Sequence, residues 1–288
     1  MRKTLTTLVL SLSLNAFAQI PVATQTLLDG VKSPESRGVI KSVLMIVCRK
    51  EGGKGTGFVL SGGEVVTTNA HVVGTCSAEE LEGVSAVSNE QVKFLRMRTD
   101  PNRDLALLCA TKPLPFSLAL NGDGNPPVDT EVETWGYPLR YEGSAPILSR
   151  GYVAGYTEGR DEQNEIKNPP VRHLIVNGAL NPGNSGGPLI DRSTGKVIGV
   201  VVEKWRLFSP FVELAITALQ HSPTGTGSAM SYTDPSGKTV RLMNEQITAA
   251  ALKEVYDKSQ VMVGEAISVS ELNAFIKEKK KDLACGSK

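Results

Sequence analysis

The chain has 288 residues, of which 40% are hydrophobic and 21% are charged, and its formal net charge is +1. This length is enough for one large domain or two smaller ones with a full hydrophobic core. The near-neutral charge gives no support for a nucleic-acid partner, which would require a strongly basic surface.

Residues 1–18 have the pattern of a secretory signal peptide. Two basic residues precede an apolar run, and Ala16 and Ala18 occupy the small-residue positions that signal peptidase recognises. The run is too short for a membrane anchor, which needs about 20 apolar residues. We therefore expect an exported protein, periplasmic or secreted, that has no membrane anchor and begins with a lead segment over residues 19–39.

Four cysteines follow in the exported part of the chain: Cys48, Cys76, Cys109 and Cys285. In an oxidising compartment an even set of this kind predicts one or two disulfide bonds, and the sequence leaves three full pairings open. Their wide spacing is unlike the closely spaced pairs of a zinc site. No motif in the chain implies a metal or an organic cofactor.

Short apolar segments separated by glycine, proline and charged residues predict an all-β first half. The six expected strands cover residues 43–50, 55–61, 64–69, 84–88, 91–98 and 104–110. We assign residues 40–110 to a first β-barrel. The proline-rich segment 111–130 has no helical period and is the predicted linker.

Residues 131–283 show the same pattern of short apolar segments and are assigned to a second β-barrel. Its six expected strands cover residues 132–138, 147–158, 172–178, 187–192, 196–203 and 261–268. The fold class is therefore all-β, with two six-stranded antiparallel barrels. A closing helix is expected to begin after Ser268, because Ser268 and Glu271 form a capping-box pattern.

An insertion over residues 204–260 separates the last two strands of the second barrel. Residues 211–220 and 244–258 are its two predicted helices. The insertion is either a lid or specificity element or surface elaboration, because loops often carry function whereas insertions are also well tolerated. Three aromatic residues near its start favour a local core over a binding patch; they are Trp205, Phe208 and Phe211.

A serine lies in the glycine-rich stretch GNSGG, residues 183–187. A serine hydroxyl is a weak nucleophile unless a histidine takes its proton and a carboxylate orients that histidine. His71, in TNAHVV, and Asp104, in DLALL, are the candidate partners of Ser185. His173 and His221 have no acid at a recognisable spacing and are expected to be solvated or satisfied in place.

These three motifs, in the order histidine, aspartate, serine, resemble those of the trypsin-like (chymotrypsin-fold) serine proteases, and most closely the bacterial HtrA or Deg branch. The resemblance covers roughly residues 40–202 and 260–282. It implies two six-stranded barrels with the active site between them, and an endopeptidase acting on protein or peptide substrates. The chain ends soon after the last expected strand, so no PDZ domain is expected. The sequence does not specify an oligomeric state.

The resemblance also assigns roles. Ser185 is the expected nucleophile, His71 the general base and Asp104 the residue that orients it. The backbone N–H groups of Gly183 and Ser185 are the expected oxyanion hole, because glycine at 183 lets the backbone turn.

Departures from the family pattern refine this expectation. Asn184 stands where the digestive branch has an aspartate that pairs with a freed N-terminus, so activation by N-terminal insertion is not expected, although residues 37–40 resemble a cleavage site. Ala179, at the base of the expected S1 pocket, has no carboxylate to attract lysine or arginine. With Val200, Val201 and Val202 as the pocket wall, we predict a small or medium aliphatic P1 residue.

Two alternatives stay open at this stage. One is a protease-like fold kept for binding, with catalysis lost. The other is an esterase, because GNSGG also satisfies the G-x-S-x-G nucleophile elbow, with His221 as base and Asp191 or Glu213 as its acid. The prolines that flank the motif argue against the elbow, which needs a strand that enters a helix.

Overall fold

The computed structural model describes residues 22–87, 90–122, 125–139, 141, 143–159, 166–204, 217–219, 229–233, 239–258, 262–283 and 285. The predicted signal peptide and the predicted helix at 211–220, apart from residues 217–219, lie outside these ranges. Among the described residues, no helix has the length and apolar character needed to span a bilayer.

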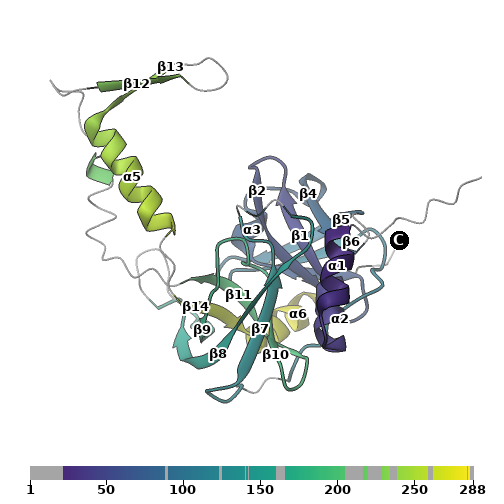
Figure 1. Ribbon diagram of the computed structural model, residues 1–288. Coiled ribbons are helices and arrows are strands. Elements are labelled where there is room, and N and C mark those ends of the chain that lie inside the picture. Colours follow the sequence, from purple (N-terminus) through teal and green to yellow (C-terminus); the bar gives the residue numbers. More distant parts are fainter. Residues whose placement is uncertain are drawn as a thin grey trace, which may run out of the picture.

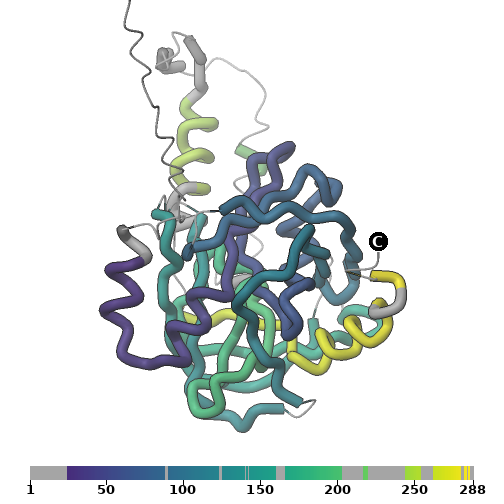
Figure 2. Tube along the Cα trace, turned by 90° about the vertical axis from the view of Figure 1, so that its right-hand side faces the viewer, coloured from purple at the N-terminus to yellow at the C-terminus, as the bar shows by residue number. Residues whose placement is uncertain are grey.

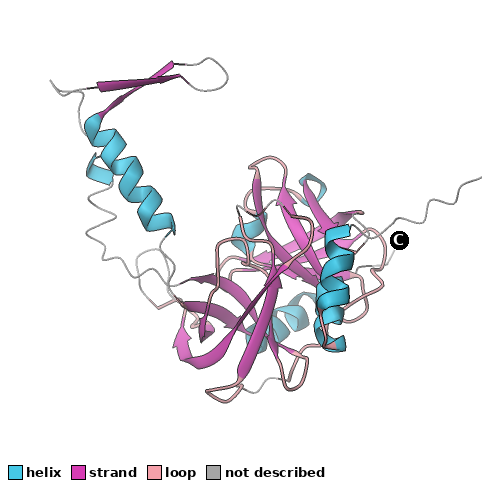
Figure 3. Cartoon of the chain, viewed as in Figure 1, coloured by secondary structure: helices cyan, strands magenta, loops and turns pink. Residues whose placement is uncertain are grey.

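Twelve strands form two closed six-stranded antiparallel barrels, as the sequence predicts (Figures 1 and 3). The first barrel has the strand order β1-β2-β3-β6-β5-β4 and the second has the order β10-β11-β14-β9-β8-β7. The strands of the first are β1 (Val43–Cys48), β2 (Gly53–Val59), β3 (Val65–Thr68), β4 (Leu81–Ser85), β5 (Gln91–Asp100) and β6 (Leu105–Ala110). Those of the second are β7 (Glu131–Gly136), β8 (Ile147–Glu158), β9 (Arg172–Gly178), β10 (Pro188–Asp191), β11 (Val197–Lys204) and β14 (Val263–Ser268).

The uninterrupted apolar run of β6 reflects burial on both of its faces. Leu105, Leu107 and Cys109 belong to a core that is shared between the two barrels. The alternate residues, Ala106 and Leu108, belong to the core inside the first barrel. Because successive side chains of a strand point to opposite faces, a strand between two cores needs apolar residues at every position.

The lead segment contains two helices that the sequence analysis did not predict, α1 (Val22–Gly30) and α2 (Pro34–Ser42). The start of α2 has a clear local cause: Ser33 caps the helix by accepting a hydrogen bond from the Ser36 amide, and proline occupies the first helical turn. Figure 2 shows these purple helices, like the yellow C-terminal helix, outside the barrel strands.

The closing helix, α6 (Val269–Leu283), is present, but its cap differs from the predicted capping box. Ser268 accepts a hydrogen bond from the Ser270 amide at 3.3 Å, whereas the Glu271 carboxylate accepts one from the Arg172 amide at 3.1 Å. Glu271 therefore ties the helix to the second barrel and does not close a reciprocal cap.

Disulfide bonds join Cys48 to Cys76 and Cys109 to Cys285. The second bond fixes the end of the chain, beyond α6, to β6 of the first barrel. The C-terminal segment of the chain is thus anchored on both barrels.

The insertion contains the predicted helix α5 (Asn244–Lys258) and a two-stranded sheet, β12 (Ala229–Thr233) with β13 (Thr239–Met243), which was not predicted. Figure 1 shows these elements apart from the two barrels. The aromatic residues 205, 208 and 211 lie outside the described part of the chain.

Candidate active site

His71 and Asp104 are joined by two hydrogen bonds. His71 lies in the one-turn helix α3 (Ala70–Val73), which directly follows β3. Its ring Nδ1 lies 2.7 Å from Asp104 Oδ2, and its backbone N–H donates to Asp104 Oδ1 at 2.9 Å. The side chain of His71 is 50% exposed and that of Asp104 is 16% exposed. The carboxylate therefore holds both the ring and the backbone of the histidine, and leaves much of the ring open to solvent.

Asp104 adopts a left-handed backbone conformation, with φ of 55°. This conformation is unfavourable for a residue with a Cβ atom and persists only when the surrounding structure holds it. Asn69 provides one restraint, because its side-chain amide donates to the Asp104 carbonyl at 2.9 Å. The strained backbone turns the Asp104 carboxylate toward His71.

Arg103 provides a second restraint on this turn. Its guanidinium is paired with Asp100 at 2.7 Å, with Glu278 at 2.8 Å and with Glu271 at 3.3 Å. The hydrogen bonds that Arg103 donates, first to Glu278 and then to Asp100, raise its pKa against the opposing effect of burial. The turn that carries Asp104 is thus fixed to α6 by an arginine that stays charged.

Ser185 lies in a tight turn between β9 and β10. The turn is closed by two backbone hydrogen bonds of 2.9 Å, from the Asn184 amide to the Asn181 carbonyl and from the Gly187 amide to the Asn184 carbonyl. Gly183 has φ of 97°, and a Cβ atom there would lie 2.4 Å from the Tyr137 carbonyl oxygen. Glycine is therefore required at position 183 for both backbone conformation and space.

The amides of Gly183 and Ser185 have no hydrogen-bond acceptor among the described residues. The neighbouring amides differ: those of Asn184, Gly186 and Gly187 all donate to carbonyl oxygens of the chain. Two unengaged N–H groups separated by one residue are what an oxyanion hole requires.

Thr56 of β2 connects the serine turn to the first barrel. Its amide donates to the Ser185 carbonyl at 2.9 Å, and its hydroxyl donates to the Gly183 carbonyl at 2.7 Å while accepting from the Tyr137 amide at 3.0 Å. A Cβ atom on the preceding Gly55 would lie within about 3 Å of both Val72 and Ser185. The strand thus brings the serine turn against the segment that carries the histidine.

Thr56 is not among the site residues expected from the sequence. The available signal is the pattern Gly-Thr-Gly at residues 55–57, in which two glycines leave room for a close backbone approach.

The Ser185 hydroxyl donates to the Val202 carbonyl at 2.5 Å. Val202 lies where the register between β11 and β14 shifts, so a β-bulge frees its backbone from regular strand pairing. Within the described chain, this is the hydrogen bond that the Ser185 side chain makes. The structure thus joins His71 to Asp104 but does not join Ser185 to His71 in this conformation.

The residues expected to line the specificity pocket differ in exposure. Val200 and Val201 are 0% and 1% exposed, and their side chains belong to the shared core and the core of the second barrel, respectively. Ala179 and Val202 are partly exposed. Of the four, only the latter two are not fully buried, and Val202 also packs against the shared core.

Asn184 is 1% exposed, and its side-chain oxygen has no hydrogen-bond partner among the described residues. An aspartate in this environment would be a buried carboxylate, which is costly without a cation. The segment 37–40, which resembles an activation site in sequence, lies inside α2, where Val39 and Ile40 are buried. Both observations agree with the expectation that N-terminal insertion plays no part here.

His173 has an acidic partner that its sequence neighbourhood does not reveal. Its Nδ1 lies 2.7 Å from Glu265 Oε2, an atom supplied by the neighbouring strand β14. His173 is only 4% exposed. The pair is a buried structural feature of the second barrel.

The esterase alternative is wrong. The serine turn leads into strand β10 of a closed barrel, whereas a nucleophile elbow leads into a helix. Asp191, its proposed acid, ends β10 and accepts hydrogen bonds from Ser193 and Thr194. His221 and Glu213 lie outside the described residues.

Two antiparallel six-stranded barrels with an aspartate–histidine pair on one and a glycine-rich serine turn on the other define the class of two-barrel serine peptidases. Residues 55–200, just over half of the chain, match the family described as the trypsin-like peptidase domain. The chain belongs to this family, as the sequence motifs predict.

Curated relatives extend the comparison. The chain is 34% identical over 147 residues to a protein of Pseudomonas putida (strain W619) named "Probable periplasmic serine endoprotease DegP-like", a match that covers 51% of this chain and 28% of the relative. It is 32% identical over 150 residues to the uncharacterized protein y4bJ of Sinorhizobium fredii, covering 52% of this chain and 22% of that one. The chain thus matches about a quarter of the length of these relatives.

Among solved structures, the Rv3671c protease in its inactive form shares the fold. Its TM-score is 0.54 at 18% identity, with 94% of this chain and 98% of that chain covered.

Proposed function

We propose that the protein is an exported serine endopeptidase, periplasmic or secreted, that uses His71, Asp104 and Ser185. The observation that carries this proposal is the double hydrogen bond between His71 and Asp104, which leaves a half-exposed imidazole in a fixed orientation. An Nδ1–H held by a carboxylate leaves Nε2 as the basic nitrogen. A histidine in this state is suited to take a proton from a nucleophile.

The mechanism follows from these roles. Nε2 of His71 removes the proton of Ser185 as its oxygen attacks the scissile carbonyl, and later gives that proton to the leaving amine. The Gly183 and Ser185 amides, which have no acceptor among the described residues, stabilise the oxyanion. Water then hydrolyses the acyl-enzyme with His71 again acting as base.

The hydrogen bond from Ser185 to Val202 is compatible with this mechanism. Catalysis requires the hydroxyl to rotate away from the Val202 carbonyl and toward His71. Ser185 is 8% exposed, and the main cost of this rotation is the loss of one hydrogen bond, which contributes about 0.5–1.5 kcal/mol net. That cost is small beside the barrier to peptide hydrolysis, so the observed rotamer is compatible with a resting position.

Ala179 and Val202 support a preference for a small or medium aliphatic P1 residue. They are the partly exposed members of the expected pocket, and neither carries a charge. Export is supported by the two disulfide bonds and by the periplasmic naming of a relative. In this pocket Val200 and Val201 act indirectly: they are buried in the cores and support the strand that carries Val202.

A catalytically silent binding protein is the second candidate, because Ser185 donates to Val202 and not to His71 in this conformation. The two candidates differ in the reactivity of Ser185. A fluorophosphonate reacts with a serine only when a base activates it.

The test is labelling of the protein with fluorophosphonate-rhodamine, together with hydrolysis of fluorogenic peptides. The proposal predicts labelling and turnover by the natural sequence, and loss of both in Ser185→Ala and His71→Ala. Ser193→Ala, which changes a serine in the turn after β10, is the matched control and should label normally. Absence of labelling in the natural sequence would support the silent protein, and a cleavage profile dominated by lysine and arginine would refute the predicted pocket.

A further inference from the structure

The histidine helix α3 is too short to fix its own orientation. It has four residues, and a single helical turn is only marginally stable by itself. A backbone hydrogen bond of 3.1 Å from the Gly74 amide to the Ala70 carbonyl closes the turn and couples its end to its beginning. Whatever holds residues 74 and 75 therefore also restrains His71.

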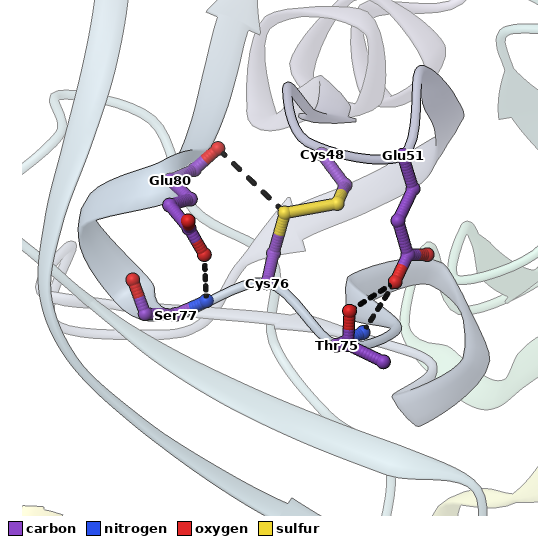
Figure 4. Close-up of a disulfide and its surroundings, with 6 residues drawn as sticks. All are labelled: Cys48, Glu51, Thr75, Cys76, Ser77 and Glu80. Carbon is purple, nitrogen blue, oxygen red and sulfur yellow. Dashed lines mark hydrogen bonds between the residues drawn. A yellow bond between two sulfur atoms is a disulfide. The ribbon is translucent and has the colours of Figure 1, made fainter.

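The loop between β1 and β2 holds this end of α3 through Glu51 (Figure 4). Oε1 of Glu51 accepts a hydrogen bond from the Thr75 amide at 2.9 Å and a second, short one from the Thr75 hydroxyl. Gly74 has φ of 54°, and a Cβ atom there would lie 2.3 Å from Oε2 of the same carboxylate. The two carboxylate oxygens thus cover the backbone where α3 ends.

The disulfide bond between Cys48 and Cys76 fixes the same loop one residue further along the chain (Figure 4). Cys48 ends β1, and the Gly52 amide donates to its carbonyl at 2.9 Å, which closes the loop that carries Glu51. The disulfide therefore sets the distance between the loop and α3, and the carboxylate sets the orientation of the last turn.

The hydrogen bonds from Thr75, first from its side chain and then from its backbone, lower the pKa of Glu51 below its ordinary value of 4.5. The carboxylate is therefore charged at neutral pH, when it is the stronger acceptor.

We propose that Glu51 is a positioning residue for His71, acting through Thr75 and the end of α3. The inference rests on the proposed function and adds to it a residue that contacts neither the substrate nor the reacting atoms. Because Glu51 is exposed, its hydrogen bonds add little to global stability. Its effect is expected on the orientation of the histidine and hence on the chemical step.

The experiment compares Glu51→Ala, Glu51→Gln and Glu80→Ala with the natural sequence. Glutamine keeps an Oε1 atom that can accept both hydrogen bonds, so it tests geometry without charge. Glu80 is a matched control, because its carboxylate accepts a hydrogen bond from the Ser77 amide at 2.8 Å in the segment that follows α3, beyond the disulfide (Figure 4).

The first readout is kinetic, with a valine p-nitroanilide peptide as substrate. A displacement of 1 Å can lower a rate by about 100-fold, and we expect Glu51→Ala to lower kcat by about tenfold with KM unchanged. Glu51→Gln should restore most of kcat, and Glu80→Ala should not lower it. A loss of equal size in Glu80→Ala, or an unchanged kcat in Glu51→Ala, would overturn the proposal.

The second readout does not depend on activity. In the Ser185→Ala background, amide hydrogen exchange of peptides covering residues 69–76 is compared among the same variants. The proposal predicts faster exchange in Glu51→Ala, with only a small change in melting temperature, and exchange like the parent in the other two. If this change occurs in a protein that never labels or turns over, the positioning role stands and the proposed function fails; if exchange is unchanged, the positioning role fails.

Discussion

The two halves of the candidate active site are held in different ways. On the first barrel, His71 and Asp104 are bonded to each other and braced from outside by Asn69 and by the ion pairs of Arg103. On the second barrel, the backbone of the serine turn is fixed by Thr56, but the Ser185 side chain is directed at Val202. In the proposed mechanism the base is thus already held by Asp104, whereas the nucleophile has to turn away from Val202 to engage it.

This difference has a physical origin. A histidine acts through the orientation of a ring, which hydrogen bonds to one nitrogen and to the backbone can fix in advance. A serine hydroxyl rotates about a single bond and takes the best acceptor within reach. The β-bulge at Val202 supplies that acceptor.

The largest expected effect comes from disrupting the hydrogen bonds between His71 and Asp104. Asp104→Asn preserves an oxygen for the His71 amide but replaces the carboxylate that selects the ring tautomer. We expect kcat to fall by about 10⁴-fold with little change in stability, as for other triads whose acid becomes an amide. Asp29→Asn is the control, because it replaces an exposed carboxylate of α1 that accepts a hydrogen bond from the Gln25 side chain; it should retain most activity in the same peptide assay.

Thr56→Val tests the hydrogen bonds that the Thr56 side chain makes around the serine turn. Valine has nearly the same shape but leaves the Gly183 carbonyl and the Tyr137 amide without their partner, at a cost of about 1–3 kcal/mol for each buried group. We expect a lower melting temperature and a loss of about tenfold in kcat, because the oxyanion hole is displaced.

Thr67→Val is the control, since the Thr67 hydroxyl bonds the Ala106 carbonyl inside the first barrel. It should lower the melting temperature and leave kcat near the natural value. An equal loss of kcat in both variants would mean that Thr56 acts only through global stability.

Removing the two disulfide bonds one at a time should have different effects on stability and on activity. By loop-closure entropy, the 176-residue separation of Cys109 and Cys285 contributes about 5 kcal/mol, against about 3.5 kcal/mol for the 28 residues between Cys48 and Cys76. Cys285→Ser should therefore lower stability in chemical denaturation more than Cys76→Ser. Cys76→Ser should lower kcat more, because it loosens the loop that holds α3; the opposite order in kcat would contradict the account.

The smallest effect concerns the charge of Glu51. Its pKa is lowered in the folded state, so its contribution to stability is present above its ordinary pKa of 4.5 and is lost as the pH falls through the lower folded value. The difference in melting temperature between the natural sequence and Glu51→Ala should be small and constant from pH 7 to pH 5 and vanish in more acidic solution. A difference that grows as the pH falls would show that the carboxylate is not stabilised by Thr75.

Much of the fold follows from the sequence, because each strand is a short apolar run bounded by turn residues. The clearest example is β6, whose burial on both faces gives an unbroken apolar pattern. β4 was expected three residues too late, since its first residues, Leu81-Glu82-Gly83, include a charge and a glycine. The Glu82 charge is met by Lys93 and Arg49, partners that only the folded barrel supplies.

The candidate site was predicted less completely. Motifs locate His71, Asp104 and Ser185. The bracing contacts of Arg103 with α6 and of Glu51 with Thr75 span sequence separations that no local pattern reveals, and Thr56 is marked only by the Gly-Thr-Gly pattern at residues 55–57. The pairing of His173 with Glu265 has the same cause, because neighbouring strands bring them together. The direction of the Ser185 hydroxyl depends on a bulge that the sequence does not mark.

The most direct test of the central claim is a crystal structure of the protein after reaction with a fluorophosphonate. The account predicts a covalent bond from phosphorus to Ser185 Oγ, release of the Val202 carbonyl, and a phosphoryl oxygen about 3 Å from the amides of Gly183 and Ser185. His71 and Asp104 should keep the two hydrogen bonds that they have without the adduct. An unmodified Ser185 still bonded to Val202 after full exposure to the reagent would contradict the account.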